Sequence, residues 1–117
     1  MPLKDRVRLL TTAAEVDEFL ERNPNSAIFK AGTCHKTQET LQRVQTHIET
    51  REDLPFGFIR VVEARPASNR VTEITGISHE SPQLVLFRDG QAIFHRDNWE
   101  ISGAALAEAL REHFTPA

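Results

Sequence analysis

Short strand-type runs alternate with segments of helical periodicity along almost the whole chain, and this alternation constrains the fold more than any other feature. We expect strands at residues 7–10, 27–30, 56–62, 84–87 and 92–95, and helices that begin near Thr12, Cys34, Pro66 and Ser102. Helices of crossover length between strands imply parallel pairs, and Asp89-Gly90 between the last two strands predicts an antiparallel hairpin. The order βαβαβαββα therefore predicts an α/β protein, a three-layer α/β/α sandwich with a mixed sheet.

Residue spacing also predicts how the helices begin, end and pack. Thr12 and Glu15 match the N-cap and third position of a capping box, Ser102 is a second expected N-cap, and Gly76 is expected to end the third helix. The predicted inner faces are Val16, Phe19 and Leu20; Thr37, Leu41, Val44 and Ile48; Val71 and Ile74; and Leu106, Ala109 and Leu110 with His113 or Phe114.

Length, composition and charge exclude several classes of protein. A chain of 117 residues that is 39% hydrophobic and 26% charged is expected to form one folded domain spanning residues 1–117. The net charge of 14 − 17 = −3 lacks the basic excess that nucleic-acid binding needs. No apolar run approaches the roughly 18 residues of a membrane span, and the first four residues lead into charges. We therefore expect a cytoplasmic protein with neither nucleic acid nor membrane as a partner.

The only cysteine of the chain, Cys34, stands where a predicted strand gives way to a predicted helix. One cysteine excludes an internal disulfide and a cysteine-rich zinc site. The unpaired N–H groups at a helix start favour a thiolate, and His35 and Lys36 add groups that can be cationic. Gly32 and Thr33 before it also differ from the apolar neighbours of an inert core cysteine. The sequence thus indicates a nucleophilic Cys34.

Thr37 limits what this cysteine can do. In a Cys-X-X-Cys oxidoreductase the second thiol resolves the mixed disulfide, but here that position is a threonine, so an outside thiol must complete the cycle. The Thr37 hydroxyl either donates to the Cys34 sulfur or bonds to its own backbone. The five histidines include no pair spaced i, i+4 on one helix face, and we expect no metal site.

A second informative segment is His79-Glu80-Ser81-Pro82, in which Pro82 lies 48 residues after Cys34. A proline is tolerated at the start of a strand, and from the residues alone we expect its peptide bond to be trans. His79 and Glu80 either approach the thiol or lie in a solvated loop; near the thiol, Glu80 would accept a proton or raise the cysteine pKa. Trp99 either forms part of a ligand surface or packs beneath the last helix, and we expect the packing role.

Together, these motifs resemble those of a known family. Cys-X-X-Thr after a strand, a Ser-Pro before a hairpin and the predicted element order resemble the thioredoxin fold, in which such a proline is cis and faces the reactive cysteine. From roughly Thr12 to Leu110 the chain is similar to the monothiol bacilliredoxins of the bacillithiol system (the YtxJ type). The motifs that carry this likeness are Phe29-Lys30 through Thr33-Cys34, His79-Glu80-Ser81-Pro82-Gln83, Asp89-Gly90 and Trp99-Glu100-Ile101-Ser102. The family more often has Pro-Ile-Ser after its cysteine, where this chain has His35-Lys36-Thr37.

The resemblance implies a thioredoxin-like domain that acts as a thiol-disulfide oxidoreductase. Cys34 would be the catalytic residue, with Thr33, His35, Lys36 and Thr37 forming the environment of its thiolate. Ser81 and Pro82 would bind an extended substrate, with Glu80 and His79 beside them. The partners implied are bacillithiolated client proteins, and the co-substrate is bacillithiol, with no tightly bound cofactor. We expect the protein to act as a monomer.

Two other functions stay open at the level of sequence. One is a monothiol glutaredoxin-like carrier that holds an iron-sulfur cluster through Cys34 and a bound thiol. The chain has His35-Lys36-Thr37 after its cysteine, however, and lacks the Gly-Phe-Ser of that family's loop. The other is a redox-inactive thioredoxin-fold module that binds a peptide. A visible absorbance band would favour the carrier, and a thiol pKa near the free value of about 8.5 would favour the inactive module.

Overall fold

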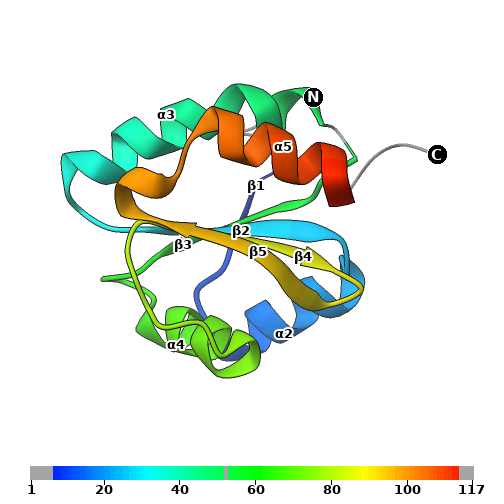
Figure 1. Ribbon diagram of the computed structural model, residues 1–117. Helices are drawn as coiled ribbons and strands as arrows, with labels where there is room; N and C mark the ends of the chain where they lie inside the picture. The colour runs from blue at the N-terminus through cyan, green and yellow to red at the C-terminus, as the bar shows by residue number, and fades with distance from the viewer. Residues whose placement is uncertain (1–6, 52, 114–117) are drawn as a thin grey trace.

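The computed structural model describes residues 7–51 and 53–113 and confirms the predicted order of elements (Figure 1). The elements are β1 (Val7–Leu9), α2 (Ala13–Arg22), β2 (Ser26–Ala31), α3 (His35–Thr50), β3 (Phe56–Arg60), α4 (Arg65–Thr75), β4 (Gln83–Arg88), β5 (Gln91–Asp97), the 3₁₀ turn η1 (Asn98–Glu100) and α5 (Gly103–His113). Phe114, which the sequence offered for the inner face of the last helix, lies outside the described residues.

The strands form one mixed sheet in the order β1-β3-β2-β4-β5. Helices α3 and α5 cover one face and α2 and α4 cover the other, which confirms the three-layer sandwich (Figure 1). In the hairpin between β4 and β5, Asp89 and Gly90 have φ of 55° and 79°. Positive φ at both central residues is the conformation that a two-residue turn of type I′ requires. The Asp-Gly signal in the sequence therefore predicted this turn correctly.

One strand pairing differs from the sequence prediction. β1 and β2 run parallel to β3, but β4 pairs with β2 in the antiparallel sense although a helix precedes it. The register places Gln83, the first residue of β4, opposite Lys30, which is the penultimate residue of β2. The segment 76–82 after α4 must therefore return the chain to the edge where β2 ends. This return brings the Ser81-Pro82 segment to the same edge as Cys34.

Two apolar cores fill the spaces between the layers. Phe29 of β2 stacks on Phe58 of β3 beneath α3 and α5, with 6.0 Å between ring centroids and 3° between ring planes. The second core lies beneath α2 and α4 and includes Val16 and Val71. Two details of the sequence prediction were wrong, because β3 ends at Arg60, which leaves Val62 62% exposed, and Ile74 is 40% exposed. The buried face of α4 consists instead of Ala67, Ser68 and Val71.

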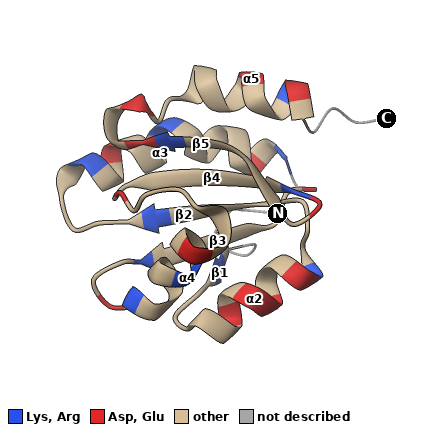
Figure 2. Ribbon diagram, turned by 60° about the horizontal axis from the view of Figure 1, so that its bottom comes forward, with Lys and Arg blue, Asp and Glu red and all other residues tan. Residues whose placement is uncertain are grey.

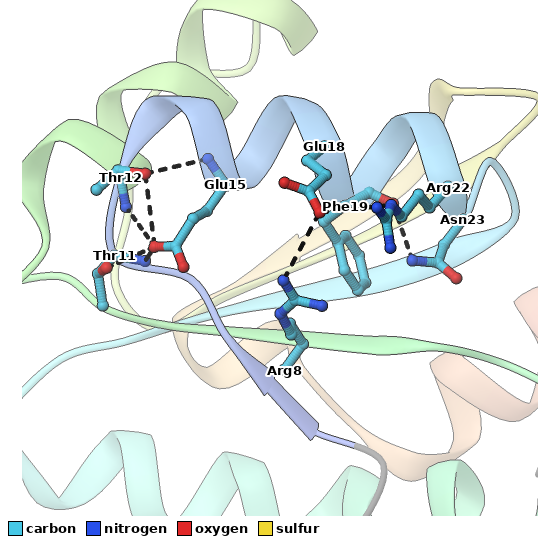
Figure 3. A network of polar contacts seen from close by, with 8 residues as sticks. All are labelled: Arg8, Thr11, Thr12, Glu15, Glu18, Phe19, Arg22 and Asn23. Atoms are coloured by element: carbon cyan, nitrogen blue, oxygen red, sulfur yellow. Dashed lines mark hydrogen bonds and ion pairs between the residues drawn. The ribbon is translucent and has the colours of Figure 1, made fainter.

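The start of α2 is fixed by the predicted capping box, shown in Figure 3. Thr12 Oγ1 accepts a hydrogen bond of 3.1 Å from the N–H of Glu15, and Glu15 Oε1 accepts one of 3.1 Å from the N–H of Thr12. Glu15 Oε1 also accepts a hydrogen bond of 2.9 Å from the N–H of Thr11. These donated bonds lower the pKa of Glu15, chiefly through the side chain of Thr11. Three backbone donors are thus satisfied at the start of this helix.

Replacement of Thr12 by alanine is expected to lower the free energy of unfolding by about 1 kcal/mol, because it removes the hydroxyl that accepts from Glu15. Urea unfolding followed by circular dichroism measures this change. Glu21→Ala is the matched control, since Glu21 is exposed on the same helix. A Thr12→Ala protein as stable as the control would contradict the importance of this cap.

Candidate active site

Cys34 is the N-cap residue of α3, directly after the turn that ends β2. Its backbone is extended (φ −87°, ψ 165°), its thiol is exposed, and the sulfur makes no capping hydrogen bond. Thr37 holds the turn together, because its hydroxyl oxygen accepts a 2.9 Å bond from the N–H of Gly32. The Thr37 N–H also donates to the Cys34 carbonyl at 3.1 Å. Among the described residues no hydrogen bond joins the Thr37 hydroxyl to the Cys34 sulfur, so this side chain shapes the turn.

Opposing effects act on the Cys34 thiol, and their sum favours the thiolate. Partial desolvation of the exposed thiol by neighbouring atoms raises the pKa of Cys34, whereas the backbone N–H groups of Lys36 and Thr37 and the positive charge of Lys36 lower it. The lowering effects outweigh this desolvation, and the pKa lies below its ordinary value. This is the direction that the sequence predicted from a helix start and a neighbouring cation.

The segment that carries Pro82 packs against the cysteine turn. The Ser81–Pro82 peptide bond is cis, so the trans bond expected from the residues alone was wrong and the cis bond implied by the resemblance is present. A Cβ added to Gly32 would lie 3.1 Å from Ser81 Oγ and 3.3 Å from Thr37 Oγ1, which shows how closely the two segments approach. Only a glycine fits at position 32 without displacing a neighbour. Gly32 and Ser81 therefore bring the cysteine turn and the Ser81-Pro82 segment into contact.

His79 lies over a buried lysine. Its Nδ1 is 3.3 Å from Lys30 Nζ and 3.2 Å from Ser68 Oγ. Lys30 is fully buried, and its Nζ also donates to Thr72 Oγ1 at 3.1 Å. Burial lowers the pKa of Lys30 to about 8, although the charge of Asp97 opposes this effect. Burial, followed by the charge of Lys30, lowers the pKa of His79. No described hydrogen bond joins His79 to Cys34, and its contacts are with β2 and α4.

Glu80 is connected to the start of α3 through Asn98. Asn98 Nδ2 donates to Glu80 Oε2 at 3.2 Å, and Asn98 Oδ1 accepts from Lys36 Nζ at 3.1 Å. The backbone N–H of Asn98 donates to the Pro82 carbonyl at 2.9 Å. The side chain and the backbone N–H of Asn98 thus link α3, the Ser81-Pro82 segment and the end of β5.

Trp99 does not pack beneath the last helix, so that expectation was wrong. It is 47% exposed, and its ring centroid is 6.1 Å from that of His35, the residue after Cys34. The Arg43 guanidinium lies 5.3 Å from the Trp99 ring centroid, within the range of a cation-π contact. Arg43 also donates to the carbonyls of Trp99 and Ile101, at 3.4 and 3.2 Å. These bonds hold the indole beside the cysteine helix rather than in the core.

A solvent-open pocket of about 300 Å³ adjoins the cysteine turn on the side of β3. Its lining combines apolar residues such as Phe58 with polar ones that include Thr33, Thr37 and Arg60. In residues 7–51 and 53–113 no group of three His, Cys, Asp or Glu side chains is arranged to hold a metal ion. In those same residues no helix has the length and apolar character needed to cross a membrane.

Three residues of this region were not predicted from the sequence: Lys30, Arg43 and Asn98. Asparagine is one of the few residues that adopt the left-handed region readily, and Asn98 has φ of 51°. Asn98 directly follows β5, but it lies three residues past the strand predicted at 92–95, so the sequence did not single it out. Lys30, at the end of an apolar run, gave no signal that its amine would be buried.

Comparison with known proteins agrees with this geometry. A sequence model of the family described as monothiol bacilliredoxin BrxC matches residues 8–106. The solved structure of a proposed oxidoreductase with a thioredoxin fold is 23% identical and has a TM-score of 0.82, over 91% of this chain and 95% of that one. Mitochondrial thioredoxin 3 from Saccharomyces cerevisiae is 21% identical with a TM-score of 0.73, over 91% and 94%. A mutant thioredoxin from Halobacterium salinarum NRC-1 is 21% identical with a TM-score of 0.74, over 97% and 94%.

Proposed function

This chain belongs to the monothiol bacilliredoxin family and has a thiol-disulfide redox role, and we propose that its specific reaction is the removal of bacillithiol from protein mixed disulfides. The observation that carries the proposal is the setting of Cys34, an exposed thiol at a helix start whose pKa is lowered. A thiolate is the form that attacks a disulfide. The lowered pKa favours this reaction over a redox-inactive peptide-binding module.

The first step exchanges one disulfide for another. The Cys34 thiolate attacks the bacillithiol sulfur of the mixed disulfide, the bond from that sulfur to the client sulfur breaks, and the client leaves as a thiolate. A new disulfide joins Cys34 to bacillithiol, and the total number of thiols and disulfides is unchanged. The client cysteine is thereby reduced at the expense of Cys34.

The second step needs a thiol from outside the chain, because the sequence contains no other cysteine. A second molecule of bacillithiol, as its thiolate, attacks the bacillithiol sulfur of the mixed disulfide on Cys34. Cys34 leaves as a thiolate, and bacillithiol disulfide is the product. Thr37, at the position of a resolving cysteine, cannot perform this step because a hydroxyl does not form a disulfide.

The Ser81-Pro82 segment offers a place for the client chain beside Cys34. Proline has no N–H, and the Pro82 carbonyl already accepts from the N–H of Asn98 at 2.9 Å. No described hydrogen bond uses the backbone N–H or C=O of Ser81. We therefore assign pairing with an extended client segment to the backbone of Ser81, with Pro82 fixing the path of the chain next to it.

The test is a transfer experiment followed by intact mass. Incubation of the reduced protein with a client that carries bacillithiol as a mixed disulfide is expected to add one bacillithiol to Cys34 and to free the client thiol. Protein whose Cys34 has been blocked with iodoacetamide is the control. A client that loses bacillithiol no faster with the native protein than with the blocked protein would contradict the proposal.

The same assay with a glutathione mixed disulfide measures which low-molecular-weight thiol the site prefers. We expect faster transfer from the bacillithiol client. A purified protein with a visible absorbance band and no transfer would instead indicate the iron-sulfur carrier.

A further inference from the structure

The side-chain amide of Asn98 stands between two opposite charges next to the cysteine helix. Its Oδ1 accepts from Lys36 Nζ at 3.1 Å, and its Nδ2 donates to Glu80 Oε2 at 3.2 Å. Lys36 and Glu80 form no direct ion pair in the described part of the chain. Each charge therefore contacts one end of a neutral amide rather than the other charge.

We propose that Asn98 is a positioning residue for Cys34, which keeps the Lys36 ammonium group from pairing with Glu80 and so leaves its charge directed at the thiol. This inference rests on the proposed function, because it assigns a residue that prepares Cys34 for attack on a disulfide. Neither Asn98 nor its separation of these two charges was visible in the sequence.

The chemistry of the amide explains why asparagine suits this place. A carboxamide has both an acceptor and donors, so it can bond to an ammonium at one end and to a carboxylate at the other. An ammonium paired with a carboxylate has much of its field cancelled, and its effect on a nearby thiol falls accordingly. Lys36 is the side-chain charge that lowers the pKa of Cys34. Direct pairing with Glu80 would weaken that effect.

The backbone of Asn98 allows the side chain to be removed cleanly. Its φ of 51° lies in the left-handed region, which glycine adopts without a steric penalty. Its N–H, which donates to the Pro82 carbonyl, belongs to the backbone and persists in a glycine variant. Asn98→Gly therefore removes only the amide between Lys36 and Glu80, whereas Asn98→Ala would also strain the backbone.

The test is the pKa of Cys34, measured from the pH dependence of its alkylation by iodoacetamide. We expect Asn98→Gly to raise that pKa by about 0.5, which is the scale of a partly exposed charge interaction. Adding Glu80→Gln to this variant removes the competing carboxylate and is expected to reverse at least half of the rise. Glu80→Gln with Asn98 in place is the control for a direct effect of the carboxylate on the thiol, and it should lower the pKa less than the same change does in the Asn98→Gly protein.

Two outcomes would overturn the inference: a native thiol pKa in Asn98→Gly, or a raised pKa that Glu80→Gln leaves unchanged. Thermal unfolding of each variant verifies that it is folded at the temperature of the assay. Iodoacetamide alkylation does not involve bacillithiol, so this test is independent of the proposed reaction. A native protein that fails to transfer bacillithiol, together with a raised pKa in Asn98→Gly, would reject the function and retain the positioning role.

Discussion

Replacement of Cys34 by serine is expected to lower the rate of bacillithiol transfer by at least about a thousandfold, to that of the client alone. A serine hydroxyl stays protonated at neutral pH and cannot form a disulfide, whereas the Cys34 thiol has a lowered pKa. The Cys34 side chain is exposed and makes no capping bond, whereas a serine hydroxyl at this N-cap can accept from the first N–H groups of α3, so the replacement should leave the free energy of unfolding unchanged or raise it by up to about 1 kcal/mol. Loss of activity would then reflect lost chemistry in an intact fold.

A pH series on the native protein sharpens this prediction. The transfer rate should rise with pH as the thiolate fraction grows, and the midpoint of this rise should lie at a lower pH than for an unperturbed thiol. Single-turnover kinetics followed by quenched-flow mass spectrometry measure both effects. Gln45→Ala, at an exposed position on the same helix, is the control and should keep the native rate and pH profile. Residual transfer in the Cys34→Ser protein above the rate of the client alone would mean that another group is the nucleophile.

Replacement of Lys30 by methionine is expected to make the protein more stable at pH 7, by about 1–3 kcal/mol. Lys30 is fully buried in β2, and burial lowers its pKa to about 8. Below that pH the folded protein holds a buried ammonium group that the unfolded chain exposes to water. Methionine fills a similar volume without a charge. The hydrogen bonds from Lys30 to Thr72 and His79 offset part of the gain.

The pH dependence of stability identifies Lys30 as the source. Between pH 8 and about 10.4 the unfolded chain binds a proton that the folded chain has lost, so native stability should rise with pH across this window. Lys30→Met should remove that rise. Lys36→Met, at a less buried lysine, should retain it. Urea unfolding from pH 7 to pH 10 decides between these outcomes, and a Lys30→Met protein that is less stable at pH 7 with the native alkaline slope would contradict the prediction.

The element order was predictable because its signals are local. The capping box of Thr12 and Glu15, the Asp89-Gly90 turn and the left-handed Gly76 each act within a few residues, and the structure contains all three. The start of α3 at Cys34 was predictable for the same reason. Such features depend on backbone geometry that a few neighbouring residues dictate.

The remaining features depend on contacts between distant segments. Asn98 meets Lys36 across 62 positions and His79 meets Lys30 across 49, and no periodicity links these pairs. The antiparallel direction of β4 depends on how segment 76–82 returns over the sheet, which the crossover-length argument could not show. The packing role expected for Trp99 was wrong for the same reason, because contacts with Arg43 and His35, distant in the sequence, hold its ring at the surface. The cysteine at the start of a helix was thus visible in the sequence, but most of the contacts around it were not.

The position of Trp99 gives the protein an intrinsic optical reporter. It is the only tryptophan of the chain, it is half-exposed, and its ring lies 6.1 Å from that of His35, which follows Cys34 directly. Indole emission depends on contact with water and with neighbouring charges, and a group attached to the Cys34 sulfur would alter both. The fluorescence of the unlabelled protein can therefore follow the occupancy of Cys34 in real time, without a dye and without a coupled enzyme.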